Sequence, residues 1–207
     1  MLACLLSAPA QAADDELLYA QRGIYLGAGG NFMLMTRKSD IAGDVEKSLG
    51  DTPGLQSDVD DSFGMNARLG YRLNPKLAVE TQFEWASNIE VDSRLNGVAS
   101  TEKIALMVLT GNAKYFLLTG RIQPYLVAGA GWGRSRVKPA TGGSREREDG
   151  WAARGGAGVN LYGNRDVAFN LETTYVYPAG GQIKNLDNFS FTAGLTLFFY
   201  PKWLGDR

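Results

Sequence analysis

The stretch NFSFTAGLTLFF, residues Asn188 to Phe199, has the clearest strand pattern in the chain and decides the fold. Its apolar residues occupy every second position: Phe189, Phe191, Ala193, Leu195, Leu197 and Phe199. Polar or small residues fill the alternate positions, and only Phe198 interrupts the pattern. Because successive side chains of a strand point to opposite faces, the stretch predicts a β-strand with one apolar and one polar face.

The composition fits a single domain built from such strands. The chain has 207 residues, 44% of them hydrophobic and 21% charged, with 26 glycines. The net charge of −1 gives no basic surface for nucleic acid, so no nucleic-acid partner is expected. Beyond the first dozen residues no apolar run approaches the roughly 18 residues of a transmembrane helix.

Seven further segments repeat the alternation, which gives eight predicted strands. They span 23–36, 62–73, 77–85, 103–117, 123–136, 151–162, 166–177 and 188–199. Long polar connections at 37–61, 86–101, 138–150 and 178–187 alternate with short turns at 74–76, 119–121 and 163–165; a weak helical spacing occurs at 41–49. Eight strands with alternating connections predict an all-β, antiparallel, up-and-down barrel.

Alternation alone allows two barrels, a soluble one with an apolar cavity and a membrane one with a polar lumen. Most strand glycines share the face of the charged residues, where small residues make room for long side chains inside a narrow barrel. Aromatic residues lie on the apolar face near the strand ends, like the two girdles of a transmembrane barrel. The predicted girdles are Tyr71, Trp85, Tyr115, Trp132, Trp151, Tyr175, Tyr177 and Phe199.

The last strand also resembles the C-terminal β-signal of bacterial outer-membrane barrels, through Thr192, Gly194, Leu197 and Phe199. The segments IYLGAG at 24–29 and PYL at 124–126 add to the likeness. Together, from Gly23 to Phe199, the chain resembles the eight-stranded outer-membrane barrel family that includes outer membrane proteins A and X. The chain departs from that family by continuing through residues 200–207.

The resemblance implies a place in the outer membrane of a Gram-negative bacterium, as a monomer assembled by the barrel-assembly machinery. It also implies extracellular long loops, periplasmic termini, and contact with membrane lipid and lipopolysaccharide. Host or environmental ligands could bind at the loops.

The first residues resemble the end of a signal peptide. A short apolar segment precedes Ala10-Gln11-Ala12, an A-x-A cleavage site. The expected layout is a signal-peptide remnant at 1–12, a periplasmic segment at 13–22, the barrel at 23–199 and a periplasmic tail at 200–207. Cys4, the only cysteine, falls in the remnant; a lipoprotein site there is a weaker alternative.

The chemistry of the chain does not favour an enzyme. Histidine is absent, so histidine-assisted hydrolysis and imidazole metal ligation are not expected. No catalytic residue, cofactor or metal site is predicted. The charged residues expected inside the lumen are Arg68, Arg72, Glu80, Glu84, Lys114, Arg154 and Glu172.

Buried charges of both signs should pair across a narrow lumen. We therefore expect a barrel with a structural or surface-interaction role and a lumen closed by ion pairs. Two alternatives stay open: a small gated porin for ions or small solutes, and a soluble secreted barrel that binds an apolar ligand.

Overall fold

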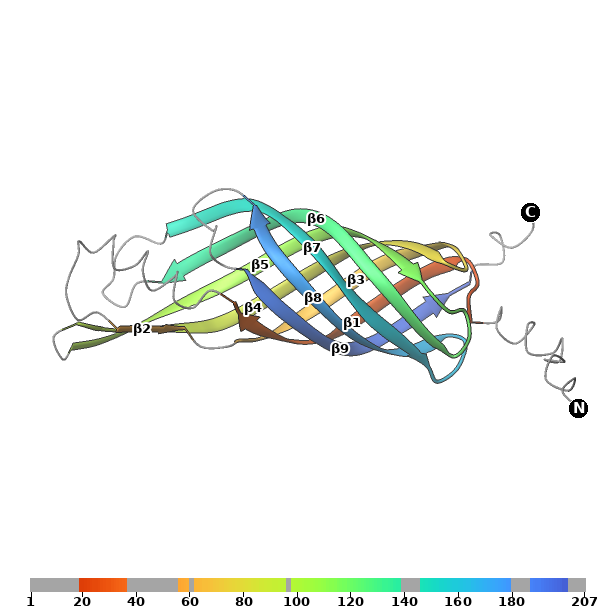
Figure 1. The fold of residues 1–207 in the computed structure, drawn as a ribbon, viewed down its shortest axis with the longest axis horizontal. Helices are drawn as coiled ribbons and strands as arrows, with labels where there is room; N and C mark the ends of the chain where they lie inside the picture. Colours follow the sequence, from red (N-terminus) through yellow and green to blue (C-terminus); the bar gives the residue numbers. More distant parts are fainter. Residues whose placement is uncertain are drawn as a thin grey trace, which may run out of the picture.

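Eight strands form a closed antiparallel barrel, as predicted (Figure 1). This computed structural model describes residues 19–36, 56–59, 62–95, 98–138, 146–179 and 187–200. The barrel strands are β1 (Gly23–Met35), β3 (Ser62–Asn74), β4 (Leu77–Leu95), β5 (Val98–Phe116), β6 (Ile122–Lys138), β7 (Glu146–Tyr162), β8 (Val167–Ala179) and β9 (Asn188–Phe199). A short ninth strand, β2 (Gln56–Val59), pairs with β4 outside this ring.

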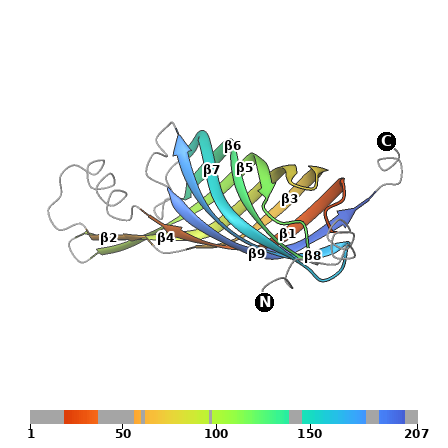
Figure 2. The same ribbon diagram turned by 45° about the vertical axis from the view of Figure 1, so that its right-hand side comes forward.

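The barrel closes because the first strand pairs with the last. Their register runs without interruption from Ile24 opposite Phe199 to Met35 opposite Asn188. Every barrel strand is thus hydrogen-bonded on both sides, which leaves no open edge within the ring of eight strands. We call the end where β1 begins and β9 ends the terminal end, and the opposite end the loop end (Figure 2).

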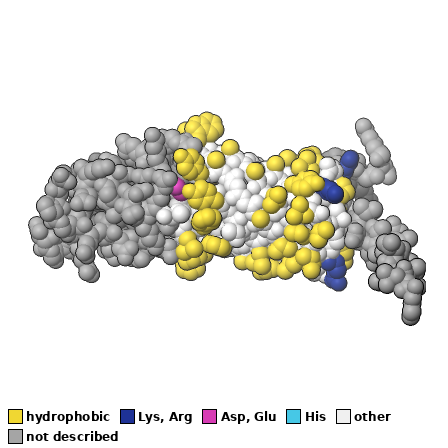
Figure 3. Space-filling view, in the orientation of Figure 1, with side chains coloured by type: hydrophobic (Ala, Val, Ile, Leu, Met, Phe, Trp, Pro, Cys, Tyr) yellow, Lys and Arg dark blue, Asp and Glu magenta, His cyan; other side chains and the backbone are white. Residues whose placement is uncertain are grey.

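The apolar face of the strands points outward and the polar face inward. Phe63 and Trp151 are 75% and 63% exposed, whereas Arg72 and Glu84 are 1% exposed. The outer surface carries hydrophobic side chains toward both ends of the described barrel (Figure 3). This distribution is the reverse of a water-soluble barrel and matches a barrel whose outer wall faces lipid. No helix in the described residues is long and apolar enough to cross a membrane.

The second connection was predicted wrongly. Residues 86–101 were expected to form a long polar loop, but β4 continues to Leu95 and β5 begins at Val98. The two strands pair over most of this length, with a register irregularity between Ala86 and Ile89. β2, near the end of the first predicted connection, pairs with the outer part of β4. The result is a three-stranded extension beyond the loop end (Figure 1).

The third connection is also shorter than predicted. β6 extends to Lys138 and β7 begins at Glu146, so most of the charged run before Trp151 is strand. Arg134 lies opposite Asp149, and its Nε is 2.6 Å from Asp149 Oδ1. An ion pair between neighbouring strands supports pairing that hydropathy did not reveal.

Several predictions fall outside the described residues. These are the signal-peptide remnant and its cleavage site, the helical spacing at 41–49, and residues 201–207 of the tail.

Candidate functional site: the barrel lumen

The lumen is organised around the carboxylate of Glu172 on β8. Its Oε2 is 3.0 Å from Lys114 Nζ and 3.4 Å from Arg68 Nη1, and its Oε1 is 3.6 Å from Arg154 Nη2. The hydroxyl of Tyr125 donates a hydrogen bond to the same carboxylate at 2.8 Å. One carboxylate thus contacts cations from β3, β5 and β7, which ties together opposite parts of the wall.

Two further carboxylates, both on β4, balance the charge. Glu80 Oε2 lies 3.0 Å from Lys114 Nζ and accepts a 2.9 Å hydrogen bond from Tyr25. Glu84 Oε1 lies 2.7 Å from Arg154 Nη2. We call these six side chains the central charged cluster: Arg68, Glu80, Glu84, Lys114, Arg154 and Glu172. Three cations against three carboxylates leave it without net charge, as a poorly hydrated interior requires.

Arg72 was expected in the same network, but the structure places it apart. Its Nη1 donates to Gln123 at 2.8 Å, to the Tyr162 hydroxyl at 3.2 Å and to the Tyr19 carbonyl at 3.3 Å. Its guanidinium lies 4.1 Å from the centre of the Phe116 ring. None of these partners is a carboxylate. Arg72 belongs to the terminal end because it is near the end of β3, beyond the reach of the three glutamates.

Aromatic side chains close the terminal end of the lumen. We call Tyr25, Phe116, Tyr125, Tyr162 and Phe198 the aromatic layer; all are at most 5% exposed and form one buried cluster. The ring centre of Phe198 lies 5.3 Å from that of Tyr25 and 5.2 Å from that of Tyr162. Phe198 interrupted the alternation because its side chain fills the lumen rather than the outer wall.

Sequence reasoning missed these inward aromatics, although cross-strand glycines signal two of them. Tyr25 lies opposite Gly70, and Tyr125 lies opposite Gly158. A Cβ at either glycine would collide with the tyrosine ring. A glycine on the polar face therefore makes room for a large ring packed flat across the strand. Asn170 falls on the predicted polar face of its strand, but its part in the network was not predicted: it accepts a 2.8 Å hydrogen bond from Arg68.

The loop end of the lumen has a different lining. Met33, Ala86, Leu106, Val108, Ala152 and Val176 form a second buried cluster, the upper apolar layer. Near it, both polar atoms of the Asn31 side chain and the hydroxyl of Thr110 lack hydrogen-bond partners among the described residues. Buried polar groups of this kind usually form hydrogen bonds with ordered water.

The predicted girdle residues lie on the outer face, but Trp85, Trp132 and Trp151 are well inside their strands, because β4, β6 and β7 extend further than predicted. At the loop end the rings of Trp132 and Trp151 are neighbours, 5.6 Å between centres, and Tyr175 packs on Phe189 at 5.1 Å. Trp85 and Tyr71 are partly exposed, and the others of the set are Tyr115, Tyr177 and Phe199 at 46–48% exposure. Of the β-signal positions, Thr192 and Gly194 lie on the inner face of β9, whereas Leu197 and Phe199 point outward.

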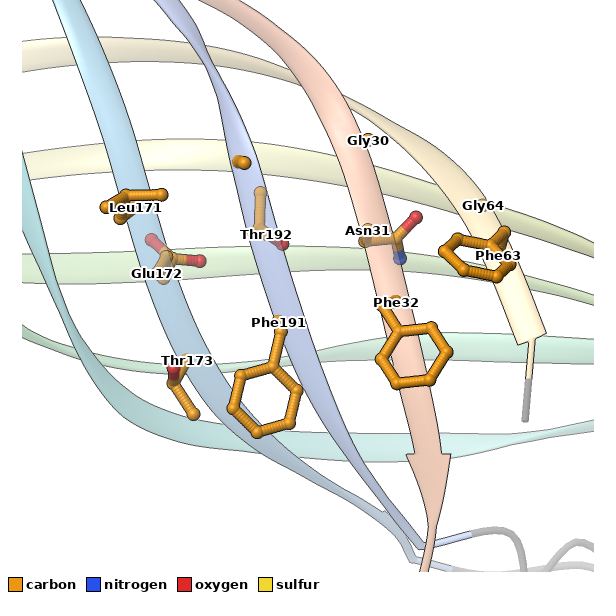
Figure 4. A pocket seen from close by; sticks show the side chains of 11 residues that line it. Gly30, Asn31, Phe32, Phe63, Gly64, Leu171, Glu172, Thr173, Phe191 and Thr192 are labelled. Atoms are coloured by element: carbon orange, nitrogen blue, oxygen red, sulfur yellow. The ribbon is translucent and has the colours of Figure 1, made fainter.

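A groove of about 530 Å³ lies along the wall formed by the neighbouring strands β8, β9, β1 and β3 (Figure 4). Phe32, Phe63 and Phe191 flank it, and Gly30 leaves it open. In the described residues no group of three or more His, Cys, Asp or Glu side chains could hold a metal ion.

Comparison with protein families agrees with this architecture. The sequence model of one protein family, the outer membrane protein beta-barrel domain, matches residues 1–199. The chain belongs to this family. Membership indicates a bacterial outer-membrane location. Among curated protein sequences, none matches the chain.

Solved structures share the fold at low sequence identity. Neisserial surface protein A superposes with a TM-score of 0.63 at 18% identity, covering 86% of this chain and 97% of that one. The outer membrane protein OprG of Pseudomonas aeruginosa gives 0.59 at 15%, covering 89% and 99%. The attachment invasion locus protein Ail of Yersinia pestis gives 0.51 at 14%, covering 86% and 97%. These likenesses show the fold alone.

Proposed function

We propose that the protein is a closed outer-membrane barrel with a structural and surface-interaction role, and that its lumen does not conduct. The observation that carries this proposal is the neutral central charged cluster between the aromatic layer and the upper apolar layer. A solute would have to separate buried ion pairs and then displace packed rings. Leaving one buried charge without its partner costs about 3–5 kcal/mol.

The interaction role is assigned to the loop end. We infer that this end faces the cell exterior and that the termini are periplasmic, because the longer connections of such barrels are extracellular. The three-stranded extension of β2, β4 and β5 projects from this end and offers a stiff platform for a partner (Figure 1). Lipopolysaccharide is the first candidate, with host or environmental ligands next. An Ail structure holds the heparin analogue sucrose octasulfate. Binding of a polyanion to the loop end is therefore a suitable test of the interaction role.

The barrel is inferred to be monomeric and non-enzymatic. The chain has no histidine, and the buried carboxylates are already paired with cations. The gated porin stays the alternative function, because ion pairs that exchange partners could open a path. Arg154 favours this alternative most, since its Nε and Nη1 have no hydrogen-bond partner among the described residues.

Single-channel recording in planar bilayers separates the two functions. The proposal predicts no stepwise conductance in the wild-type protein. Glu84→Ala and Arg154→Ala each break the 2.7 Å pair but leave the aromatic layer in place, so they are also expected to be silent. Asp149→Ala, which breaks an exposed pair at the loop end, is the matched control. Reproducible conductance in the wild type, altered by either lumen variant, would establish the porin instead.

A further inference from the structure

An exposed cation precedes each strand that runs away from the terminal end. These strands are β1, β4, β6 and β8, and they are every second strand around the wall. The cations are Arg22, Lys76, Arg121 and Arg165. They are therefore distributed around the whole circumference of the terminal end rather than gathered on one side. We call them the cationic rim.

The cationic rim lies next to the edge of the apolar outer wall. Arg121 comes one residue before Ile122, which is 61% exposed, and Arg22 comes two residues before Ile24. A strand rises about 3.3 Å per residue, so each charged group starts within a few ångströms of the apolar edge. Long basic side chains at this depth extend toward the headgroups of the bilayer. Lys and Arg side chains gather at this end on the visible face (Figure 3).

Hydrogen bonds in the short turns hold the rim in place. The side-chain oxygen of Asn74 accepts from the backbone N–H groups of Lys76 and Leu77, both at 2.9 Å. Asn164 does the same for the two residues after Arg165, at 2.9 and 2.8 Å. Arg121 donates to the carbonyl of Gly163 at 3.2 Å, which links two neighbouring turns. The positions of the charges are thus set by ordered turns.

Little negative charge opposes the rim. Among the described residues of the terminal end, Asp166 is the exposed carboxylate, and it lies 3.8 Å from Arg165. Within the described part of this end, four cations against one carboxylate leave an excess of three positive charges. Such a ring attracts net-anionic headgroups and gains nothing from zwitterionic ones.

We propose that the cationic rim binds anionic phospholipid headgroups, such as phosphatidylglycerol, in the leaflet at the terminal end. The proposal goes beyond the closed-barrel function and does not depend on it, nor on which side of the membrane this end faces. A lipid held at each of four positions would fix the depth of the barrel in its bilayer.

The test measures the association of spin-labelled phosphatidylglycerol and phosphatidylcholine with the barrel in mixed vesicles. Wild type is expected to prefer phosphatidylglycerol, by up to about fivefold at a site with one well-placed cation, and less in high salt. The variant R22Q/K76Q/R121Q/R165Q should lose the preference. R134Q, which removes an exposed cation at the loop end, should keep it.

Two double variants keep the test decisive where the fourfold change prevents folding, as judged by heat-dependent gel mobility. R22Q/R165Q and K76Q/R121Q should each lower the preference by about half of the full loss. D166N removes the opposing carboxylate and should raise the preference. The proposal is overturned by a wild type without lipid preference, or by a folded rim variant that keeps the wild-type preference.

Discussion

Glu172→Gln gives the most specific prediction about stability, because the change removes one charge and keeps the shape of the side chain. Glu172 contacts three cations at 3.0–3.6 Å. Lys114 would still pair with Glu80 at 3.0 Å, and Arg154 with Glu84 at 2.7 Å. Arg68 would keep only amide partners, at 2.8 and 3.2 Å.

Removing one member of a buried ion pair costs about 3–5 kcal/mol. We expect the lower end of this range, about 3 kcal/mol, because two of the three cations keep a carboxylate. The free energy of unfolding is measured by urea titration in lipid vesicles with tryptophan fluorescence. Asp166→Asn, which neutralises an exposed carboxylate, is the control and should change stability by about 0.5 kcal/mol or less.

Arg68→Gln provides the second half of a double-mutant cycle. The double variant restores equal numbers of cations and carboxylates in the cluster, so it should lose less stability than the two single variants added together. A loss below about 1 kcal/mol in Glu172→Gln, or simple additivity in the double variant, would refute the reasoning that Glu172 neutralises Arg68.

Three further changes test other parts of the structure by the same unfolding assay. Gly158→Ala places a methyl group against the buried ring of Tyr125 and should destabilise the barrel by about 1–3 kcal/mol. Gly155→Ala, with no atom within 4 Å of the new methyl group, should leave stability unchanged. Equal effects of the two variants would contradict the assigned inner and outer faces of β7. Leu195→Arg, in the middle of the outer wall, should lower the free energy of unfolding in lipid by about 2–4 kcal/mol. Leu118→Arg, in a terminal-end turn, should lower it by about 0–1 kcal/mol. A larger loss in Leu118→Arg than in Leu195→Arg would show that the inferred position of the bilayer is wrong. Phe198→Ala should cost about 3–5 kcal/mol, and a loss near zero would show that the aromatic layer is not packed.

The barrel itself could be predicted because a membrane fixes the alternation of each strand. Between Ile24 and Phe32, or between Phe189 and Phe199, one face meets lipid and the other meets the lumen. Beyond the membrane both faces of a strand meet water, so the alternation of apolar and polar residues is lost. The sequence of such a strand then resembles the sequence of a polar loop. The extension of β4 and β5 was missed for this reason, although Asn96-Gly97 is the usual sequence signal of a tight hairpin.

The lumen could be predicted as a set of residues but not as a set of contacts. Alternation identified Arg68, Lys114 and Glu172 as inward residues. Their mutual contacts depend on the stagger between strands that are not neighbours, which one sequence does not reveal. Arg72 lies apart from the cluster because it is near the end of β3, and Phe198 points inward because it alternates with the outward Leu197 and Phe199.

Labelling of a single cysteine tests most directly whether the lumen is closed. In a Cys4→Ser background, Thr196→Cys places a thiol on the inner face beside the central charged cluster, where Thr196 is 3% exposed. Asn164→Cys places one on an exposed terminal-end turn. A water-soluble maleimide should label the turn cysteine rapidly in the folded barrel and the lumen cysteine only after unfolding. Comparable labelling of both in the folded protein would contradict a closed lumen.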